Sequence, residues 1–166
     1  LPFTLLKGQS MVKTTLESAY AAVKKLVRDF DDNKNRYLSK DYSEAAVRKD
    51  FIDKFFTALG WDVDHNVEKN PYEQEVKIEL NLDVKGRKKR ADYAFYLRPN
   101  FRDVVFYAEA KKPSVEIENA DDYFQAVRYG YNSKTPIAVL TDFEQFHALD
   151  CRYSPSIDTA LDRSIK

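Results

Sequence analysis

Hydrophobic positions in the first sixty residues repeat with helical spacing. A capping box of Thr14 and Glu17 predicts the start of a helix that reaches about Phe30. The apolar residues on one stripe of this helix are Leu16, Tyr20, Val23 and Val27. Polar residues 31–35 then interrupt the pattern, so we expect the helix to end there.

A second helix is predicted after Ser43, because serine is a favoured N-cap residue. Gly60 is expected to end this helix, since glycine readily adopts the left-handed conformation that follows many helices. The apolar positions between them follow the helical period and are Val47, Phe51, Ile52, Phe55, Phe56 and Leu59.

After Trp61 the pattern changes from helical to extended. The first three predicted strands span about 73–83, 90–97 and 104–111. A helix is expected over 117–131, followed by a short apolar strand at 136–141 and a last strand at about 144–150. This order, with antiparallel strands followed by a helical crossover, predicts an α/β fold with a central mixed β-sheet flanked by helices.

Composition limits the class of protein. With 166 residues, 43% of them hydrophobic, the chain is long and apolar enough for one folded domain. It contains no apolar run approaching about 18 residues, so we expect no membrane-spanning helix. The single cysteine, Cys151, cannot form an internal disulfide, which makes a cytoplasmic location the expectation.

The formal net charge is zero, with 27 basic and 27 acidic side chains, but the charges are unevenly distributed. Zero net charge argues against a free-standing, strongly basic nucleic-acid coat protein. Residues 85–112, however, hold nine basic and three acidic side chains, while both flanking segments are acidic overall. This basic segment is either a solvated turn between strands or a surface that contacts phosphate.

Candidate catalytic chemistry lies on the strand at 104–111. Alternation places Tyr107, Glu109 and Lys111 on one face, and the preceding strand carries the carboxylate of Asp92. If the two strands pair antiparallel, Asp92 and Glu109 can converge on one metal ion. Mg²⁺ needs only one or two carboxylates together with water and phosphate oxygens.

The acidic-x-Lys pattern alone has little specificity. It occurs four times, beginning at Asp32, Glu75, Asp83 and Glu109, and a surface ion pair is its ordinary meaning. Only the copy at Glu109 combines an apolar strand, a carboxylate on the preceding strand and a following helix.

This combination resembles the PD-(D/E)XK nuclease superfamily over most of residues 43–150. The resemblance implies a restriction-endonuclease-like core of αβββαβ order, with an extra N-terminal helix here. More narrowly, the segments 51–61, 106–113 and 136–143 are similar to the N-terminal endonuclease domain of fused type IIG restriction–modification enzymes and of type I restriction motor subunits. Ala91 stands where the family pattern has a proline before the aspartate.

The resemblance also implies roles for individual residues. Asp92, Glu109 and the carbonyl of Ala110 would bind Mg²⁺, for which Mn²⁺ can substitute, and Lys111 would assist the attacking water. The helix at 117–131 contains the Gln-x-x-x-Tyr motif of some branches. The remaining residues implied at the catalytic site are Gln125 and Glu44. The expected DNA contacts are Lys85, Arg87, Lys88, Lys89, Lys112 and Tyr129.

We therefore expect a Mg²⁺-dependent endonuclease domain that cuts double-stranded DNA and works with fused or associated methyltransferase, helicase or target-recognition domains. The alternative is a non-catalytic DNA-binding or docking module of the same fold, and a third interpretation is an unrelated mixed-sheet domain. The expected organisation is a tag or leader (1–10), an N-terminal helix and loop (11–42), the nuclease core (43–152) and a polar tail leading to a downstream region (153–166).

Overall fold

The computed structural model describes residues 14–84 and 87–165, with side chains for all of these except 81–84 and 87–89. The helices are α1 (Leu16–Asp32), α2 (Lys34–Tyr37), α3 (Glu44–Val47), α4 (Asp53–Ala58) and α5 (Ala120–Asn132). The strands are β1 (Val76–Val84), β2 (Arg87–Tyr96), β3 (Val104–Ala110), β4 (Ile137–Thr141) and β5 (Phe146–Asp150). A π-helical segment, Arg48–Ile52, joins α3 to α4, and the 3₁₀ turns Ile157–Thr159 and Leu161–Arg163 follow β5.

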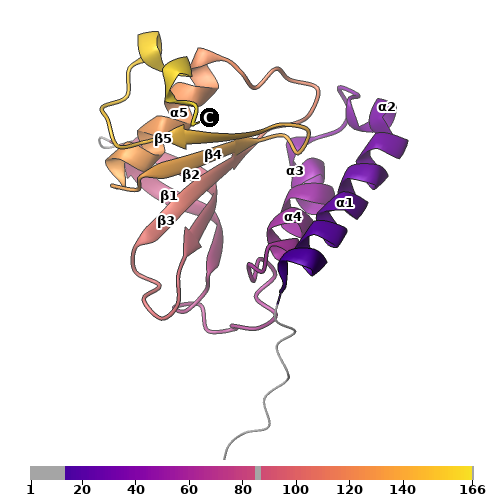
Figure 1. Ribbon diagram of the computed structural model, residues 1–166. Helices are drawn as coiled ribbons and strands as arrows, with labels where there is room; N and C mark the ends of the chain where they lie inside the picture. The colour runs from indigo at the N-terminus through magenta and orange to yellow at the C-terminus, as the bar shows by residue number, and fades with distance from the viewer. Residues whose placement is uncertain (1–13, 85–86, 166) are drawn as a thin grey trace, which may run out of the picture.

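All five strands belong to one mixed sheet, in the order β1-β2-β3-β4-β5 (Figure 1). Neighbouring strands are antiparallel except β3 and β4, which are parallel and are connected by α5. A parallel pair needs such a crossover, whereas the hairpin-connected strands do not. The predicted α/β class and mixed sheet are therefore confirmed.

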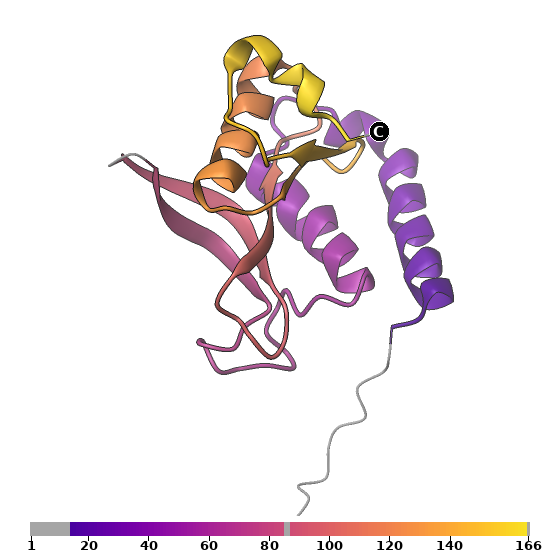
Figure 2. The same cartoon turned by 60° about the vertical axis from the view of Figure 1, so that its left-hand side comes forward.

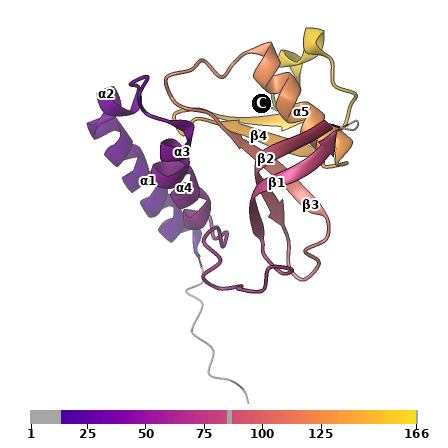
Figure 3. The same cartoon turned by 180° about the vertical axis from the view of Figure 1, so that it is seen from behind.

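Helices cover both faces of the sheet. Helices α1 to α4 lie on one side and α5 on the other, as Figures 2 and 3 show. The first side is packed by a cluster rich in aromatic rings, with Phe30, Tyr42, Val47, Phe51, Ile52, Phe56, Val63, Val76, Tyr93, Phe95, Ala108, Ala110 and Val139. The second cluster joins α5 to β4 and β5 through Ile117, Tyr123, Ala126, Val127, Ala138, Leu140, Leu149, Cys151 and Ala160. Each fully buried large apolar side chain contributes about 1.5–3 kcal/mol.

The N-terminal helix differs from its prediction in two details. The capping box consists of Thr15 and Ser18, not Thr14 and Glu17, because the helix begins one residue later. Leu16, Tyr20 and Val27 of the predicted apolar stripe are exposed and Val23 is half-buried. The helix packs mainly through Ala19, Leu26 and Phe30. The Phe30 ring contacts Tyr37, Phe51 and Phe143, so aromatic packing at the end of α1 determines which side of the helix faces the core.

The second helix has the predicted ends. The Ser43 hydroxyl accepts a hydrogen bond from the Ala46 N–H, and Gly60 has a φ of 101°. Gly130 has a different purpose, because a Cβ there would stand 2.5 Å from the Sγ of Cys151. Glycine at this position lets α5 approach the end of β5 closely.

The segment after β5 packs back against the domain, and the predicted downstream region stays a prediction. Ala160 is 2% exposed within the α5 cluster, and the Ile165 N–H donates to the Ala148 carbonyl. Although the segment is mostly polar, its few apolar side chains, such as Ala160, can be buried against the domain. No helix in the described part of the chain is long and apolar enough to cross a membrane.

Candidate active site

The pairing of the first three strands aligns three acidic residues across the sheet. Tyr93 pairs with Ala108 and Ala94 with Tyr107, so the same register places Asp92 opposite Glu109. On the other side, Ile78 pairs with Tyr93 and Leu80 with Ala91, which places Glu79 opposite Asp92. Asp92 therefore lies between two other carboxylate-bearing positions, on the central strand of the three.

Both oxygens of Asp92 accept hydrogen bonds. The backbone N–H of Ala110 donates to Oδ2 at 2.9 Å, and Nη1 of Arg48 donates to Oδ1 at 3.2 Å. The Asp92 side chain is 14% exposed. These contacts hold the carboxylate at the end of β3, where Glu109 and Lys111 also lie.

The Glu109 carboxyl is the unusual group of this region. Its residue is 6% exposed, and Oε1 is buried without a hydrogen-bond partner among the described residues. Burial, and then the neighbouring Asp92 carboxylate, raise the pKa of Glu109 from 4.5 to about 9. A buried carboxyl with one unpartnered oxygen beside a second carboxylate is costly in free energy when ionised, and a bound cation would offset that cost.

Lys111 follows β3 directly and pairs with the next helix. Its Nζ lies 2.8 Å from Oδ1 of Asp122, in the first turn of α5. Asp122 is itself fixed by Asn119, the N-cap residue, whose Nδ2 donates to Oδ2 of Asp122 at 2.7 Å. Burial acts to lower the pKa of Lys111, but Asp122, Glu44 and Glu109 together raise it.

Three further residues were predicted at or near the site, namely Glu44, Tyr129 and Gln125. Desolvation, and then the Asp92 carboxylate, raise the pKa of Glu44, which places the first residue of α3 beside the site. Tyr129 is 3% exposed, and burial and then Glu109 raise its pKa to about 12. Tyr129 is buried because α5 packs against the sheet, and its contact with DNA stays a prediction. Gln125 is half-buried one turn earlier on α5.

The expected DNA contacts are only partly described. Lys85 lies outside the described residues, and the side chains of Arg87, Lys88 and Lys89 do as well. Lys112 is half-buried, and its Nζ donates to the carbonyl of Lys40 at 3.5 Å. The basic patch around 85–90 stays a prediction.

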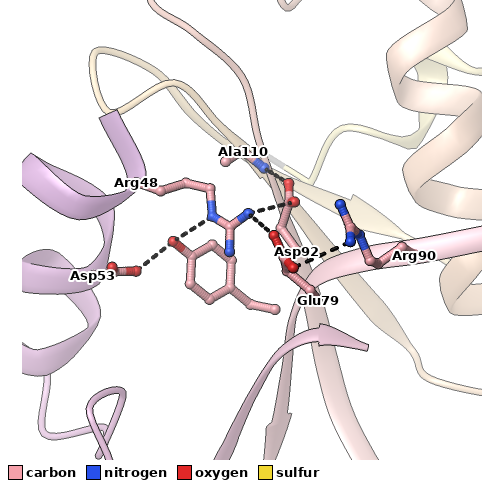
Figure 4. Close-up of polar contacts among 7 residues, drawn as sticks. Arg48, Asp53, Glu79, Arg90, Asp92 and Ala110 are labelled. Carbon is pink, nitrogen blue, oxygen red and sulfur yellow. Dashed lines mark hydrogen bonds and ion pairs between the residues drawn. The ribbon is translucent and has the colours of Figure 1, made fainter. Parts of the chain in front are cut away.

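The sequence analysis missed Arg48, together with the residues that hold it. Arg48 belongs to the π-helical segment and contacts Asp92, Glu79 and the hydroxyl of Tyr93, which donates in turn to Asp53 (Figure 4). Its position four residues after Glu44 was an available signal, since residues at that spacing share one face of a helix.

The donor set fits a small oxygen-seeking cation. In residues 14–84 and 87–165, no group of three or more His, Cys, Asp and Glu side chains is placed to hold a metal ion. Mg²⁺ does not require such a group, because it uses one or two carboxylates and keeps several waters. Asp92 and Glu109 supply two carboxylates, and the buried, unpartnered Oε1 of Glu109 is a free oxygen ligand.

Comparison with known proteins decides the family. A family model described as the N terminus of the type I restriction enzyme R protein matches residues 43–163. The chain belongs to this family. The matched segment begins at the N-cap of α3 and includes every residue of the site described above.

One curated relative extends this result to a second kind of restriction enzyme. The type II restriction enzyme and methyltransferase RM.Eco57I from Escherichia coli is 36% identical over 132 residues, which cover 78% of this chain and 13% of the relative. The chain thus spans about an eighth of the length of that relative. Both comparisons make this chain a restriction-enzyme domain. No solved structure matches the chain.

Proposed function

We propose that this chain is a Mg²⁺-dependent endonuclease domain of the PD-(D/E)XK type, with a restriction-endonuclease-like core, which hydrolyses phosphodiester bonds of double-stranded DNA. The observation that carries the proposal is the Glu109 carboxyl, buried without a partner at Oε1 and facing the Asp92 carboxylate. Two acidic groups buried against each other are stabilised either by a shared proton or by a bound cation, and the free oxygen of Glu109 favours the cation.

In this proposal Asp92 and Glu109 hold the ion, with the carbonyl of Ala110 as a third ligand. When bound, Mg²⁺ would polarise the scissile phosphate and increase the acidity of water. Tyr129 is buried close enough to Glu109 and Asp92 for their charges to raise its pKa, so in this proposal it would limit the access of water to them.

Lys111 provides positive charge next to the reacting phosphate. Because its pKa is raised and Asp122 holds its ammonium group, the residue is protonated and suited to orient water and stabilise the transition-state charge. Glu44 lies close to Asp92 and Lys111, and in this proposal Gln125 would donate to water or a phosphate oxygen.

We propose that DNA binding by this domain is weak and depends on neighbouring domains. A chain with zero net charge lacks the excess of basic residues that drives tight autonomous binding. RM.Eco57I is named as both a restriction enzyme and a methyltransferase. A fused methyltransferase with target-recognition functions would bring this domain to its DNA. Lys112 is the described basic side chain best placed to contact the backbone near the site.

Nicking of supercoiled plasmid tests the cleavage proposal. The wild-type chain with Mg²⁺ or Mn²⁺ is expected to nick the plasmid, and EDTA, Asp92→Asn or Glu109→Gln should each reduce the rate by at least about 10³-fold. Asp103→Asn, in the turn between the same two strands, serves as the control and should match the wild type.

Two results would contradict this function. Equal nicking by the wild type and both active-site variants would point to a contaminating nuclease. Metal-independent binding to DNA without nicking, unchanged in Glu109→Gln, would instead indicate a non-catalytic binding module.

A further inference from the structure

Arg48 is anchored more firmly than an ordinary surface arginine. Its side chain is 15% exposed and extends past the ring of Tyr93, with Cζ 5.0 Å from the ring centroid (Figure 4). Nε donates to the Tyr93 hydroxyl at 3.4 Å, and this hydroxyl donates to Oδ1 of Asp53 at 2.6 Å. Tyr93 is fully buried, so the guanidinium rests on a rigid support.

The other edge of the guanidinium faces two acidic residues. Nη1 lies 3.2 Å from Oδ1 of Asp92 and 3.4 Å from Oε1 of Glu79. Glu79 occupies the position opposite Asp92 on β1, and its φ of 56° is unusual for a non-glycine residue within a strand. At Glu79 the backbone of β1 departs from regular pairing with β2. In this conformation the Glu79 carboxylate lies beside Arg48.

The π-helical segment that carries Arg48 supports a functional role. Such segments are rare, and they occur frequently at functional sites because they reposition side chains of a helix. Here the helix presents Glu44 and Arg48 toward the Asp92 carboxylate.

We propose that Arg48 is a positioning residue, which orients the Asp92 carboxylate for metal binding and does not itself touch the substrate. This inference rests on the proposed function. Arg48 holds Oδ1 of Asp92 and the Ala110 N–H holds Oδ2, so the carboxylate cannot rotate about its bond to Cβ. A carboxylate has about four acceptor sites, so lone pairs remain for a cation.

Tyr93, which holds the Arg48 side chain, contributes to the orientation of Asp92 indirectly. A guanidinium is planar and always charged, so tying Nε to Tyr93 also determines the direction of Nη1. Loss of the Tyr93 hydroxyl would leave all charges next to Asp92 unchanged, while removing the support of Arg48 and the hydrogen bond to Asp53. Tyr93→Phe therefore separates positioning from simple charge neutralisation.

Binding of Mn²⁺ alone, measured by isothermal titration calorimetry at pH 8, tests this inference without reference to cleavage. Arg48→Ala is expected to weaken Mn²⁺ binding about 10–100-fold, the usual effect of removing a residue that orients a metal ligand. Arg48→Lys retains the charge without the planar fork and should weaken binding about fivefold or more. Tyr93→Phe should weaken binding about threefold to tenfold in the wild-type background and not at all in Arg48→Ala, because coupled residues are non-additive.

Arg90→Ala is the matched control. Arg90 also pairs with Glu79, at 3.3 Å, but makes no described contact with Asp92, so the Mn²⁺ affinity of this variant should stay within about twofold of the wild type. Circular dichroism verifies that each variant is folded. If Arg48→Ala does not fold, Arg48→Lys provides the test.

The outcomes distinguish this inference from the proposed function. Unchanged or tighter Mn²⁺ binding in folded Arg48 variants, together with its loss in Glu109→Gln, overturns the role of Arg48 alone. Absence of Mn²⁺ binding in the wild-type chain overturns both proposals.

Discussion

Two segments of the chain share the acidic-x-Lys pattern next to a strand, but their surroundings differ. Glu75, just before β1, accepts a hydrogen bond from Nε of Arg98 at 2.6 Å and one from the Asp62 N–H at 3.4 Å. Lys77 lies over the ring of Tyr96, 4.7 Å from its centroid. Each charge in this segment has an ordinary local partner.

The segment at the end of β3 has no such local solution. Glu109 is buried with Oε1 unpartnered and faces another carboxylate, and Lys111 pairs with Asp122 on a different element. The same residue types therefore have ordinary partners in one segment, whereas in the other a buried carboxyl keeps one oxygen without a partner and faces a second carboxylate. The difference comes from the neighbouring strand: β2 brings Asp92 to Glu109, and no acidic strand residue is brought to Glu75 in this way.

Among the changes that compare the two segments, the largest expected difference is in the nicking rates of their lysine variants. Lys111→Ala should lower the nicking rate about 10²–10³-fold, because positive charge beside the transferring phosphate is lost. Lys77→Ala, the matched control, should leave the rate within about twofold, since Lys77 contacts only an aromatic face. Single-turnover nicking assays provide the measurement, and comparable losses in both variants would refute the distinction between the segments.

A smaller effect is expected from the residue that holds Lys111. Asp122→Asn should reduce nicking about tenfold, because Lys111 loses its anchor but keeps its charge. Asp121→Asn, in the same helical turn and exposed, should not change the rate. The KM for plasmid and kcat should be measured separately, with the loss confined to kcat; a change confined to KM would assign Asp122 to DNA binding instead.

The smallest expected effect concerns stability, and it has opposite signs in the two segments. Without metal, Glu109→Gln should stabilise the chain by at least about 1.4 kcal/mol at pH 8, because it removes a carboxyl whose ionisation in the fold is unfavourable. Glu75→Gln should destabilise it by about 1 kcal/mol, since a charged hydrogen bond to the partly exposed Arg98 is weakened.

The pH dependence of that stability follows from the raised pKa of Glu109. Its ordinary value is 4.5 and its value in the fold about 9, so between these limits the folded state binds a proton that the unfolded state has lost. Stability from this group is complete below about pH 4.5 and declines as the pH rises to about 9. Urea unfolding in EDTA at pH 6 and pH 8 measures the free energy of unfolding of the wild type and of Glu109→Gln. If the extra stability of Glu109→Gln does not increase with pH, the raised pKa of the buried Glu109 carboxyl is contradicted.

Much of the fold was predictable from local signals. The second helix begins at Ser43 and ends before Gly60 as expected, because caps act through the backbone of a few adjacent residues. The rotation of α1 was not predictable, since Phe30 is placed by aromatic partners from other elements. The packing of the segment after β5 likewise depends on a surface that only the assembled α5 layer provides.

What the sequence by itself determined is the order of elements, the mixed sheet and the candidates Asp92, Glu109 and Lys111, because periodicity and alternation are properties of neighbouring residues. The register that places Asp92 opposite Glu109, and the burial that leaves Glu109 unpaired, were decided only by the tertiary structure. The same holds for Arg48, whose role depends on Tyr93, 45 residues away along the chain. Desolvation and pairing act between groups brought together by folding, and no local pattern of residues encodes them.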